Sequence, residues 1–254
     1  MNFTEVFDGL SCLSVRTLFL ALRKPSTLRT YVSYCLKRYD ELIGAGLASR
    51  GPVIPSESET ISLPSAHTGG GMSFSELVIL ARTTKTRKPG AIFEIGSYDG
   101  LTTAVFILNS PPGARILSLD LPPEAPEGRA GLESDKDLVA ARHLGSVPRA
   151  LGLNRYTQLL CDSMVFDPEP YANSIDLGLV DAAHDAEHVR NDTLKMARMM
   201  TDEGIVFWHD YGGKGAFRPL ATYLESVAKR RPIYRIPETS LAWAYARDLK
   251  EAVL

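Results

Sequence analysis

Two short segments of the sequence place carboxylates and histidines directly after apolar runs. In IDLGLVDAAHDAEHVRND, Asp181 closes an apolar run and His184 follows three positions later. In GIVFWHDYGG, His209 and Asp210 close another apolar run. Two carboxylates at one edge of a sheet could bind a hard cation such as Mg²⁺, and a histidine beside them could accept a proton near neutral pH. The sequence therefore predicts a reaction centre at these four residues.

The charged stretch after Asp181 is also compatible with the start of a helix. Asp185 and Glu187 suit a helix N-terminus, because carboxylates there face the positive end of the helix dipole. His188, one turn later, is expected to be an exposed helix residue, and His184 could merely cap the helix. The chemistry therefore depends on the elements that position these residues.

Short apolar runs alternate with amphipathic segments from residue 88 onward. We predict strands over 90–95, 114–121, 156–161, 175–182, 204–211, 232–236 and 241–247, and helices over 101–109, 135–145, 186–200 and 215–230. Parallel strands need helical crossovers, so this order predicts an α/β fold with a Rossmann-like, doubly wound, mostly parallel seven-stranded sheet. Only PETS separates the last two strands, which predicts an antiparallel last strand.

Three parts follow from the patterning. Residues 1–50 have apolar residues at helical spacing and are expected to form a helical arm for packing, dimerisation or lid closure. A homo-oligomer formed through this arm, or a peripheral membrane contact by its basic residues, is the functional expectation for it. Residues 51–72, rich in Pro, Ser and Gly, predict a linker or flap. Residues 73–254 are predicted to form the catalytic domain, beginning with a helix capped by Ser73 or Ser75.

Charge and cysteine content exclude some partners. The chain has 28 Lys and Arg against 30 Asp and Glu, a formal net charge of -2, which gives no global attraction to nucleic acid. The three cysteines are widely spaced and lack a C-x-x-C pair, which favours a reducing cytoplasm over a disulfide framework or zinc site. The apolar stretch LSVRTLFLALRK is too short to cross a bilayer, so we expect no transmembrane segment.

The turn after the first predicted strand, FEIGSYDGLTT, has glycines suited to a cofactor. A dinucleotide fingerprint would need glycine at positions occupied by Tyr98 and Leu101, so a pyrophosphate would lack its close backbone approach. S-adenosylmethionine has no phosphate and needs only a glycine-lined turn with acids for its amine and hydroxyls. The pattern from Glu94 through Gly96 to Gly100 suits that cofactor better.

Acidic residues follow the next two predicted strands. Asp120 ends the strand in LSLDLPP, where a carboxylate would accept hydrogen bonds from ribose hydroxyls. Asp162 and Ser163 follow the strand in LLCDSM, where they could receive the adenine amino group. The order of these signals on successive strands is more specific than any one of them.

Taken together, FEIGSYDGLTT, LSLDLPP, VDAAHDAEHVRND and DEGIVFWHDYGG resemble the class I S-adenosylmethionine-dependent methyltransferases. The resemblance is to the subgroup whose strands end in D-x-x-H and H-D-Y, which includes O-methyltransferases of sugars and macrolide glycosides. It covers about residues 70–247 and leaves the arm unexplained.

This resemblance implies a set of site residues. The cofactor would contact Glu94, Gly96, Ser97, Tyr98, Gly100, Thr102, Thr103, Asp120, Leu121, Asp162, Ser163 and Asp181. A divalent metal such as Mg²⁺ would be held by Asp181, His209 and Asp210, and His184 or His209 would be the catalytic base. His184 lies at the spacing at which catechol-type relatives carry their basic residue. The acceptor would be a small-molecule or glycosidic hydroxyl.

Two alternatives stay open. A metal-independent methyltransferase would need only a base and good alignment, because the methyl donor is already activated, and its acceptor could be a nitrogen. In the second alternative, the protein is a non-catalytic, cofactor-binding scaffold whose function is performed by the N-terminal arm. The row of polar groups at the strand ends weighs against the scaffold.

Overall fold

The computed structural model describes residues 46–52, 60–64, 71–125, 143–212 and 217–254. Most of the predicted arm, most of the predicted linker and most of the helix predicted over 135–145 lie outside these residues. In the part of the chain that is described, no helix is long and apolar enough to cross a membrane.

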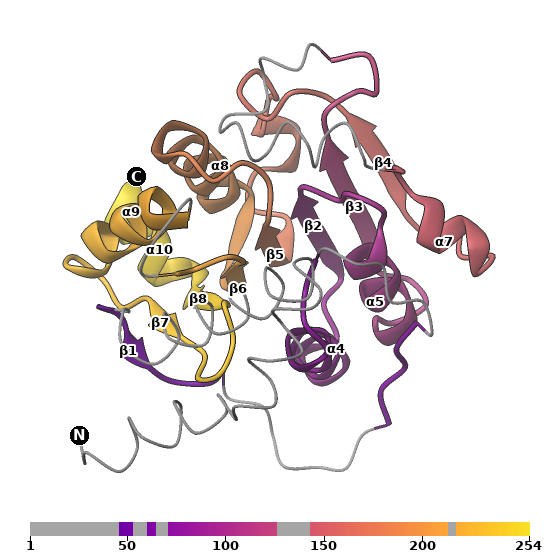
Figure 1. The fold of residues 1–254 in the computed structure, drawn as a ribbon, viewed down its shortest axis with the longest axis horizontal. Coiled ribbons are helices and arrows are strands. Elements are labelled where there is room, and N and C mark those ends of the chain that lie inside the picture. The colour runs from indigo at the N-terminus through magenta and orange to yellow at the C-terminus, as the bar shows by residue number, and fades with distance from the viewer. Residues whose placement is uncertain (1–45, 53–59, 65–70, 126–142, 213–216) are drawn as a thin grey trace, which may run out of the picture.

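One eight-stranded sheet forms the centre of the fold (Figure 1), in the order β1-β7-β8-β6-β5-β2-β3-β4. Its strands are β1 Ala48–Ser49, β2 Ala91–Ile95, β3 Arg115–Asp120, β4 Thr157–Leu160, β5 Ile175–Val180, β6 Met200–Trp208, β7 Tyr234–Arg235 and β8 Ala242–Tyr245. β2 to β6 pair in parallel, whereas β8 runs antiparallel to both β6 and β7. The predicted Rossmann-like, mostly parallel sheet with an antiparallel last strand is confirmed.

The helices cover both faces of this sheet. They are α4 Phe74–Arg87, α5 Leu101–Asn109, α7 Ser146–Ala150, α8 Ala186–Met199, α9 Arg218–Ala228 and α10 Ala246–Val253, with a 3₁₀ turn, η2, at Glu169–Tyr171. One buried apolar cluster joins the sheet to α8, α9 and α10, and a second joins it to α4 and α5. Two such cores are what a doubly wound sheet requires, since each face must be buried.

The number of strands differs from the prediction of seven. The extra strand, β1, comes from a segment that was assigned to the arm, and it pairs in parallel with β7. The backbone N–H of Arg50 donates to the carbonyl of Arg235 at 2.9 Å, and the indole N–H of Trp243 donates to the carbonyl of Arg50 at 2.6 Å. A two-residue strand has too little pattern to be recognised, yet it covers the edge that β7 would leave open.

The C-terminal segment also differs. The strand predicted over 241–247 ends at Tyr245, and α10 begins at Ala246. Within α10, Ala246, Leu249 and Ala252 are buried, which is the spacing of a helix with one apolar face. The helix has only three buried positions and follows a strong strand pattern directly, so its helical spacing was not recognised in the sequence.

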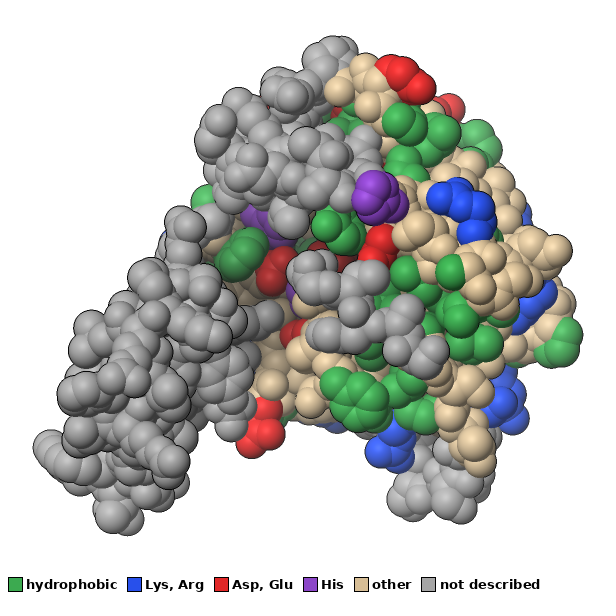
Figure 2. All heavy atoms as spheres, turned by 45° about the vertical axis from the view of Figure 1, so that its right-hand side comes forward, with side chains coloured by type: hydrophobic (Ala, Val, Ile, Leu, Met, Phe, Trp, Pro, Cys, Tyr) green, Lys and Arg blue, Asp and Glu red, His purple; other side chains and the backbone are tan. Residues whose placement is uncertain are grey.

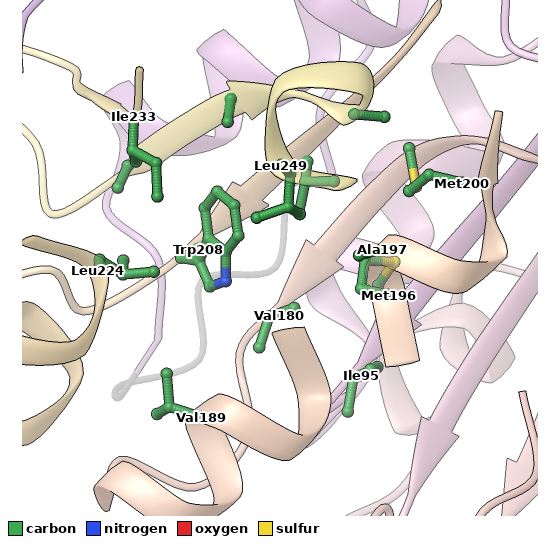
Figure 3. Packing of buried hydrophobic residues seen from close by; sticks show 14 of the residues in the cluster. Ile95, Val180, Val189, Met196, Ala197, Met200, Trp208, Leu224, Ile233 and Leu249 are labelled. Carbon is green, nitrogen blue, oxygen red and sulfur yellow. The ribbon is translucent and has the colours of Figure 1, made fainter. Parts of the chain in front are cut away.

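Trp208, near the end of β6, lies in the core. Its side chain is fully buried among Leu224, Ile233 and Leu249 (Figure 3). Its indole N–H donates to the Thr193 hydroxyl at 3.0 Å. Because neighbouring strand residues point to opposite faces, a buried Trp208 directs His209 away from this core.

Candidate functional site

The turn after β2 approaches the end of β5 very closely. Gly96 has φ +92° and Gly100 has φ +86°, conformations that favour glycine. A Cβ atom at Gly96 would overlap the backbone of Asp181 and lie 2.8 Å from the amide nitrogen of Ala182. Glycine at position 96 therefore allows the cofactor turn and the predicted reaction centre to touch.

Asp120 at the end of β3 is bonded to this turn. Its Oδ2 accepts hydrogen bonds from the amides of Ser97 and Tyr98 at 2.8 and 2.9 Å and from the Ser97 hydroxyl at 3.1 Å. Its Oδ1 accepts from the amide of Leu121 at 2.7 Å. Four residues that were predicted to bind the cofactor thus lie together, and the Asp120 carboxylate is fixed in one orientation.

Glu94 lies beneath the turn rather than on its open side. Its side chain is buried and accepts hydrogen bonds from the hydroxyls of Thr103 and Ser118, the latter at 2.9 Å. Burial raises the pKa of Glu94 to about 8, with smaller contributions from the charges of Asp181 and Asp120. Glu94 is therefore mainly protonated near neutral pH, and its contact with Thr103 ties β2 to α5.

Thr102 lies beside this pair in the first turn of α5, with 8% of its surface exposed. The preceding Gly100 is the N-cap of that helix. Ser118 is a contact that the sequence analysis did not identify, because its role appears only when β3 pairs beside β2.

The loop after β4, which holds Asp162 and Ser163, is anchored to α8. The side-chain amide of Asn191 donates to the Ser163 carbonyl at 3.0 Å, and the Lys195 ammonium donates to the carbonyls of Ser163 and Met164. Asp162 Oδ1 accepts from the Met164 amide at 2.9 Å, which makes the loop turn sharply. α8 therefore holds the residues that were predicted to contact adenine.

The reaction centre forms where β5 and β6 end. His184 Nε2 lies 3.1 Å from Asp210 Oδ2, and the His184 side chain is 7% exposed. The ring of Phe217 meets His184 edge-on, with 4.8 Å between ring centroids. Asp210 has φ +58°, so the chain turns sharply at the end of β6. The structure thus pairs His184 with Asp210 rather than leaving it as a helix cap.

Asp185 and its neighbours perform the structural role that was predicted for them. Asp185 is the N-cap of α8, and its Oδ1 accepts from the amides of Glu187 and His188 at 3.0 and 3.1 Å. His188 Nδ1 contacts Asp185 Oδ2 at 2.6 Å. This half of the charged stretch is the start of a helix, as predicted.

His209 is buried among three carboxylates. Its Nδ1 lies 3.1 Å from Asp181 Oδ1 and 3.1 Å from Asp210 Oδ2, and its Nε2 lies 3.4 Å from Glu76 Oε2. Burial alone would lower the pKa of His209, but the charges of Asp210 and Asp181 raise it well above its ordinary value. Burial would raise the pKa of Asp210, but His209 and His184 hold it well below its usual range.

Glu76 is the residue of this centre that the sequence analysis missed. It completes a capping box with Ser73, whose amide donates to Glu76 Oε2 at 2.6 Å. Its other oxygen accepts from the amide and the hydroxyl of Ser240, both at 2.7 Å. These donors and His209 outweigh burial and hold the pKa of Glu76 well below its usual range. The S-x-x-E pattern after residue 72 was the available signal.

Tyr211, directly after Asp210, is buried. Its hydroxyl donates to Glu225 Oε1 and accepts from the amide of Leu47, both at 3.2 Å. It therefore joins α9 to the segment that precedes β1.

The predicted metal ligands differ from the group that the structure brings together. Among the described residues, Asp181, His184 and Asp210 each offer a ligand atom within 4.8 Å of the others. His209, which was predicted as the third ligand, has both ring nitrogens directed at carboxylates. The set of Asp181, His209 and Asp210 therefore stays a prediction, and His209 faces carboxylate oxygens with each of its nitrogens.

Acidic and histidine side chains gather near the middle of one face of the molecule (Figure 2). Lysine and arginine side chains lie farther out on the same face. Among the residues that the structure describes, the acidic and histidine groups of this centre thus lie apart from the basic side chains.

Comparisons with known proteins agree with this geometry. Residues 93–211, which run from β2 past Asp210, match the family described as a methyltransferase domain. No curated protein sequence matches the chain. Both halves of the site, the turn and the strand ends, therefore lie within the matched segment.

Several solved structures share the fold. The S-adenosylhomocysteine-bound methyltransferase PaMTH1 of Podospora anserina is 16% identical, with a TM-score of 0.50, and the alignment covers 67% of this chain and 77% of that chain. A cofactor-bound protein from MTB is 16% identical, with a TM-score of 0.51 and coverages of 73% and 84%. A putative caffeoyl-CoA O-methyltransferase from Staphylococcus aureus is 11% identical, with a TM-score of 0.51 and coverages of 68% and 83%. The chain therefore shares the Rossmann-like fold of these structures, and its residues 93–211 are similar to the methyltransferase-domain family.

Proposed function

We propose that the protein is an S-adenosylmethionine-dependent O-methyltransferase that acts on a small-molecule or sugar hydroxyl. The observation that carries the proposal is the contact between the turn after β2 and the residues at the end of β5. The Gly96 turn, which fixes Asp120, meets the backbone of Asp181, where the reaction centre begins. A methyl donor bound by the turn would lie beside the side chains that could activate an acceptor.

The cofactor side follows from the strand ends. S-adenosylmethionine, when bound, supplies a methyl group on a positively charged sulfur. Asp120 would accept from the ribose hydroxyls, the role of an acidic residue at the end of the second strand in such sheets. Asp162 and Ser163 would receive the adenine amino group from a loop that α8 holds in place. Thr102 would contact the methionine part from the first turn of α5.

His184 would act as the general base. In the neutral tautomer that donates Nε2–H to Asp210, Nδ1 carries the lone pair that accepts the proton of the acceptor hydroxyl. As this proton leaves, the new oxygen–carbon bond forms while the sulfur–carbon bond breaks, which gives a methyl ether and S-adenosylhomocysteine. Asp210 would orient the ring and stabilise the imidazolium that results.

The proposed class of acceptor is based on the resemblance of the strand-end motifs and on the side chain of Phe217, which packs against His184. The D-x-x-H and H-D-Y strand ends resemble those of enzymes that methylate sugars and macrolide glycosides. Phe217 adds an apolar face against His184, on which a sugar ring or an aromatic ring could pack. Both acceptor types present a hydroxyl beside an apolar surface.

Formation of S-adenosylhomocysteine from S-adenosylmethionine tests the proposal. The assay uses a panel of glycosides and catechols with the wild type, His184→Ala and the matched control His188→Ala. We expect wild type and His188→Ala to turn over one acceptor class and His184→Ala to lose about 10²–10⁴-fold in rate. Equal turnover by His184→Ala would refute its role as base. Cofactor binding without turnover on any acceptor would favour a scaffold.

A further inference from the structure

We propose that the buried ring of His209 takes the place of a divalent cation between Asp181 and Asp210, so that the reaction centre works without a bound metal. The inference deepens the proposed function, on which its meaning for catalysis rests. Its evidence is the position of one ring among three carboxylates. His209 is 4% exposed and contacts an acid through each of its nitrogens.

The hydrogen-bond inventory fixes the state of this ring. Ionised carboxylates only accept hydrogen bonds, so a nitrogen that faces one must carry a hydrogen. Nδ1 faces Asp181 and Asp210, and Nε2 faces Glu76. Both nitrogens therefore donate, and the ring is an imidazolium with one positive charge.

A positive ring at this position lies next to three acids that have little contact with solvent. Glu76 is 1% exposed, and Asp181 and Asp210 are only 23% and 17% exposed at their side chains. Buried charges are costly unless they are paired and hydrogen-bonded. The imidazolium donates to Asp181 and Glu76 and lies within ion-pair distance of Asp210, so its positive charge stands where the charge of a divalent ion would otherwise be.

The same contacts leave poor conditions for Mg²⁺. Magnesium requires a nearly octahedral set of ligands and is usually held by one or two carboxylates together with several waters. Here Asp210 Oδ2 already accepts from His184 and lies within ion-pair distance of His209, while Asp181 Oδ1 accepts from His209. A metal held by these oxygens would lie next to a positive ring, and the two charges would repel.

His209 consequently acts as a positioning residue. It links β5 and the end of β6 to α4 through Glu76, which is in turn bonded to Ser240 before β8. Asp210, held on one side by His209, meets His184 on the other. The proposed base is thus oriented by a cluster of side chains, and no step of the reaction requires a metal.

Metal titration tests this directly, because it needs neither cofactor nor turnover. Calorimetry and thermal melting are measured with Mg²⁺ and Mn²⁺ on the wild type, His209→Asp and the neutral control His209→Asn. We expect no uptake by the wild type at millimolar metal. His209→Asp, which replaces the cation with a fourth carboxylate, should bind Mn²⁺ and melt at a higher temperature in its presence. His209→Asn should respond more weakly.

Several outcomes would overturn the inference. One is Mg²⁺ or Mn²⁺ uptake by the wild type that Asp210→Asn abolishes. Another is a folded His209→Asp that binds no metal. If His209→Asp folds only with Mn²⁺ present, that rescue supports the inference. If neither variant folds, wild-type uptake decides alone. A failure of S-adenosylhomocysteine to bind would refute the proposed function and leave the metal result intact.

Discussion

Replacing Glu94 with glutamine should make the protein more stable at neutral and alkaline pH. The pKa of Glu94 is raised from 4.5 to about 8 by burial, so the folded state keeps the carboxyl protonated while the unfolded state ionises above 4.5. Unfolding then releases a proton between these values, and the free energy of unfolding falls as pH rises. At about 1.4 kcal/mol per pH unit, the wild type loses at most about 5 kcal/mol by pH 8 and nothing further above it.

The glutamine side chain keeps the shape and an oxygen that can accept from Thr103 and Ser118 but has no proton to lose. Urea unfolding of the wild type and Glu94→Gln from pH 5 to pH 9 measures the difference. We expect similar stabilities near pH 5 and a gap of several kcal/mol, about 5 at most, above pH 8. The control is Glu203→Gln, at an exposed position. Parallel pH profiles for wild type and Glu94→Gln would refute the buried, protonated carboxyl.

Three further substitutions test other contacts. Gly96→Ala should abolish S-adenosylhomocysteine binding or folding, because its Cβ overlaps the backbone at Asp181; normal binding in calorimetry would contradict the close approach. Thr193→Val removes the acceptor of the buried Trp208 indole and should cost about 1–3 kcal/mol in urea unfolding, whereas Thr193→Ser should cost less. Lys195→Met frees the loop after β4 and should raise the dissociation constant of S-adenosylhomocysteine up to about tenfold, with little change in melting temperature. An unchanged dissociation constant would show that the loop after β4 does not contribute to binding of S-adenosylhomocysteine.

The sequence was sufficient for the parallel part of the sheet because its strands are continuous apolar runs. β5 is buried nearly along its length and β6 is buried from Gly204 to Trp208, and such apolar runs are recognised without help from tertiary contacts. β1 has two residues, and α10 follows a strand without a break, so neither shows a clear pattern of apolar residues in the sequence. Their positions depend on edge pairing and on packing against the sheet.

The strand-end residues were predictable as a group, but their pairing was not. Parallel strands place Asp181 and Asp210 at one edge, as expected. Which histidine contacts which carboxylate depends on the directions of the side chains. In the structure His184 contacts Asp210, and His209 is buried. Glu76 lies 133 positions before His209, and a capping pattern alone gives no sign of such a contact.

Binding of S-adenosylhomocysteine tests the central claim most directly. Isothermal titration calorimetry is performed with the wild type and with Asp120→Ala, which removes the carboxylate that Ser97, Tyr98 and Leu121 hold at the end of β3. We predict one binding site per chain in the wild type and loss of binding in Asp120→Ala. Absence of heat at millimolar ligand with the folded wild type, or equal affinity in Asp120→Ala, would contradict a cofactor site at this edge of the sheet.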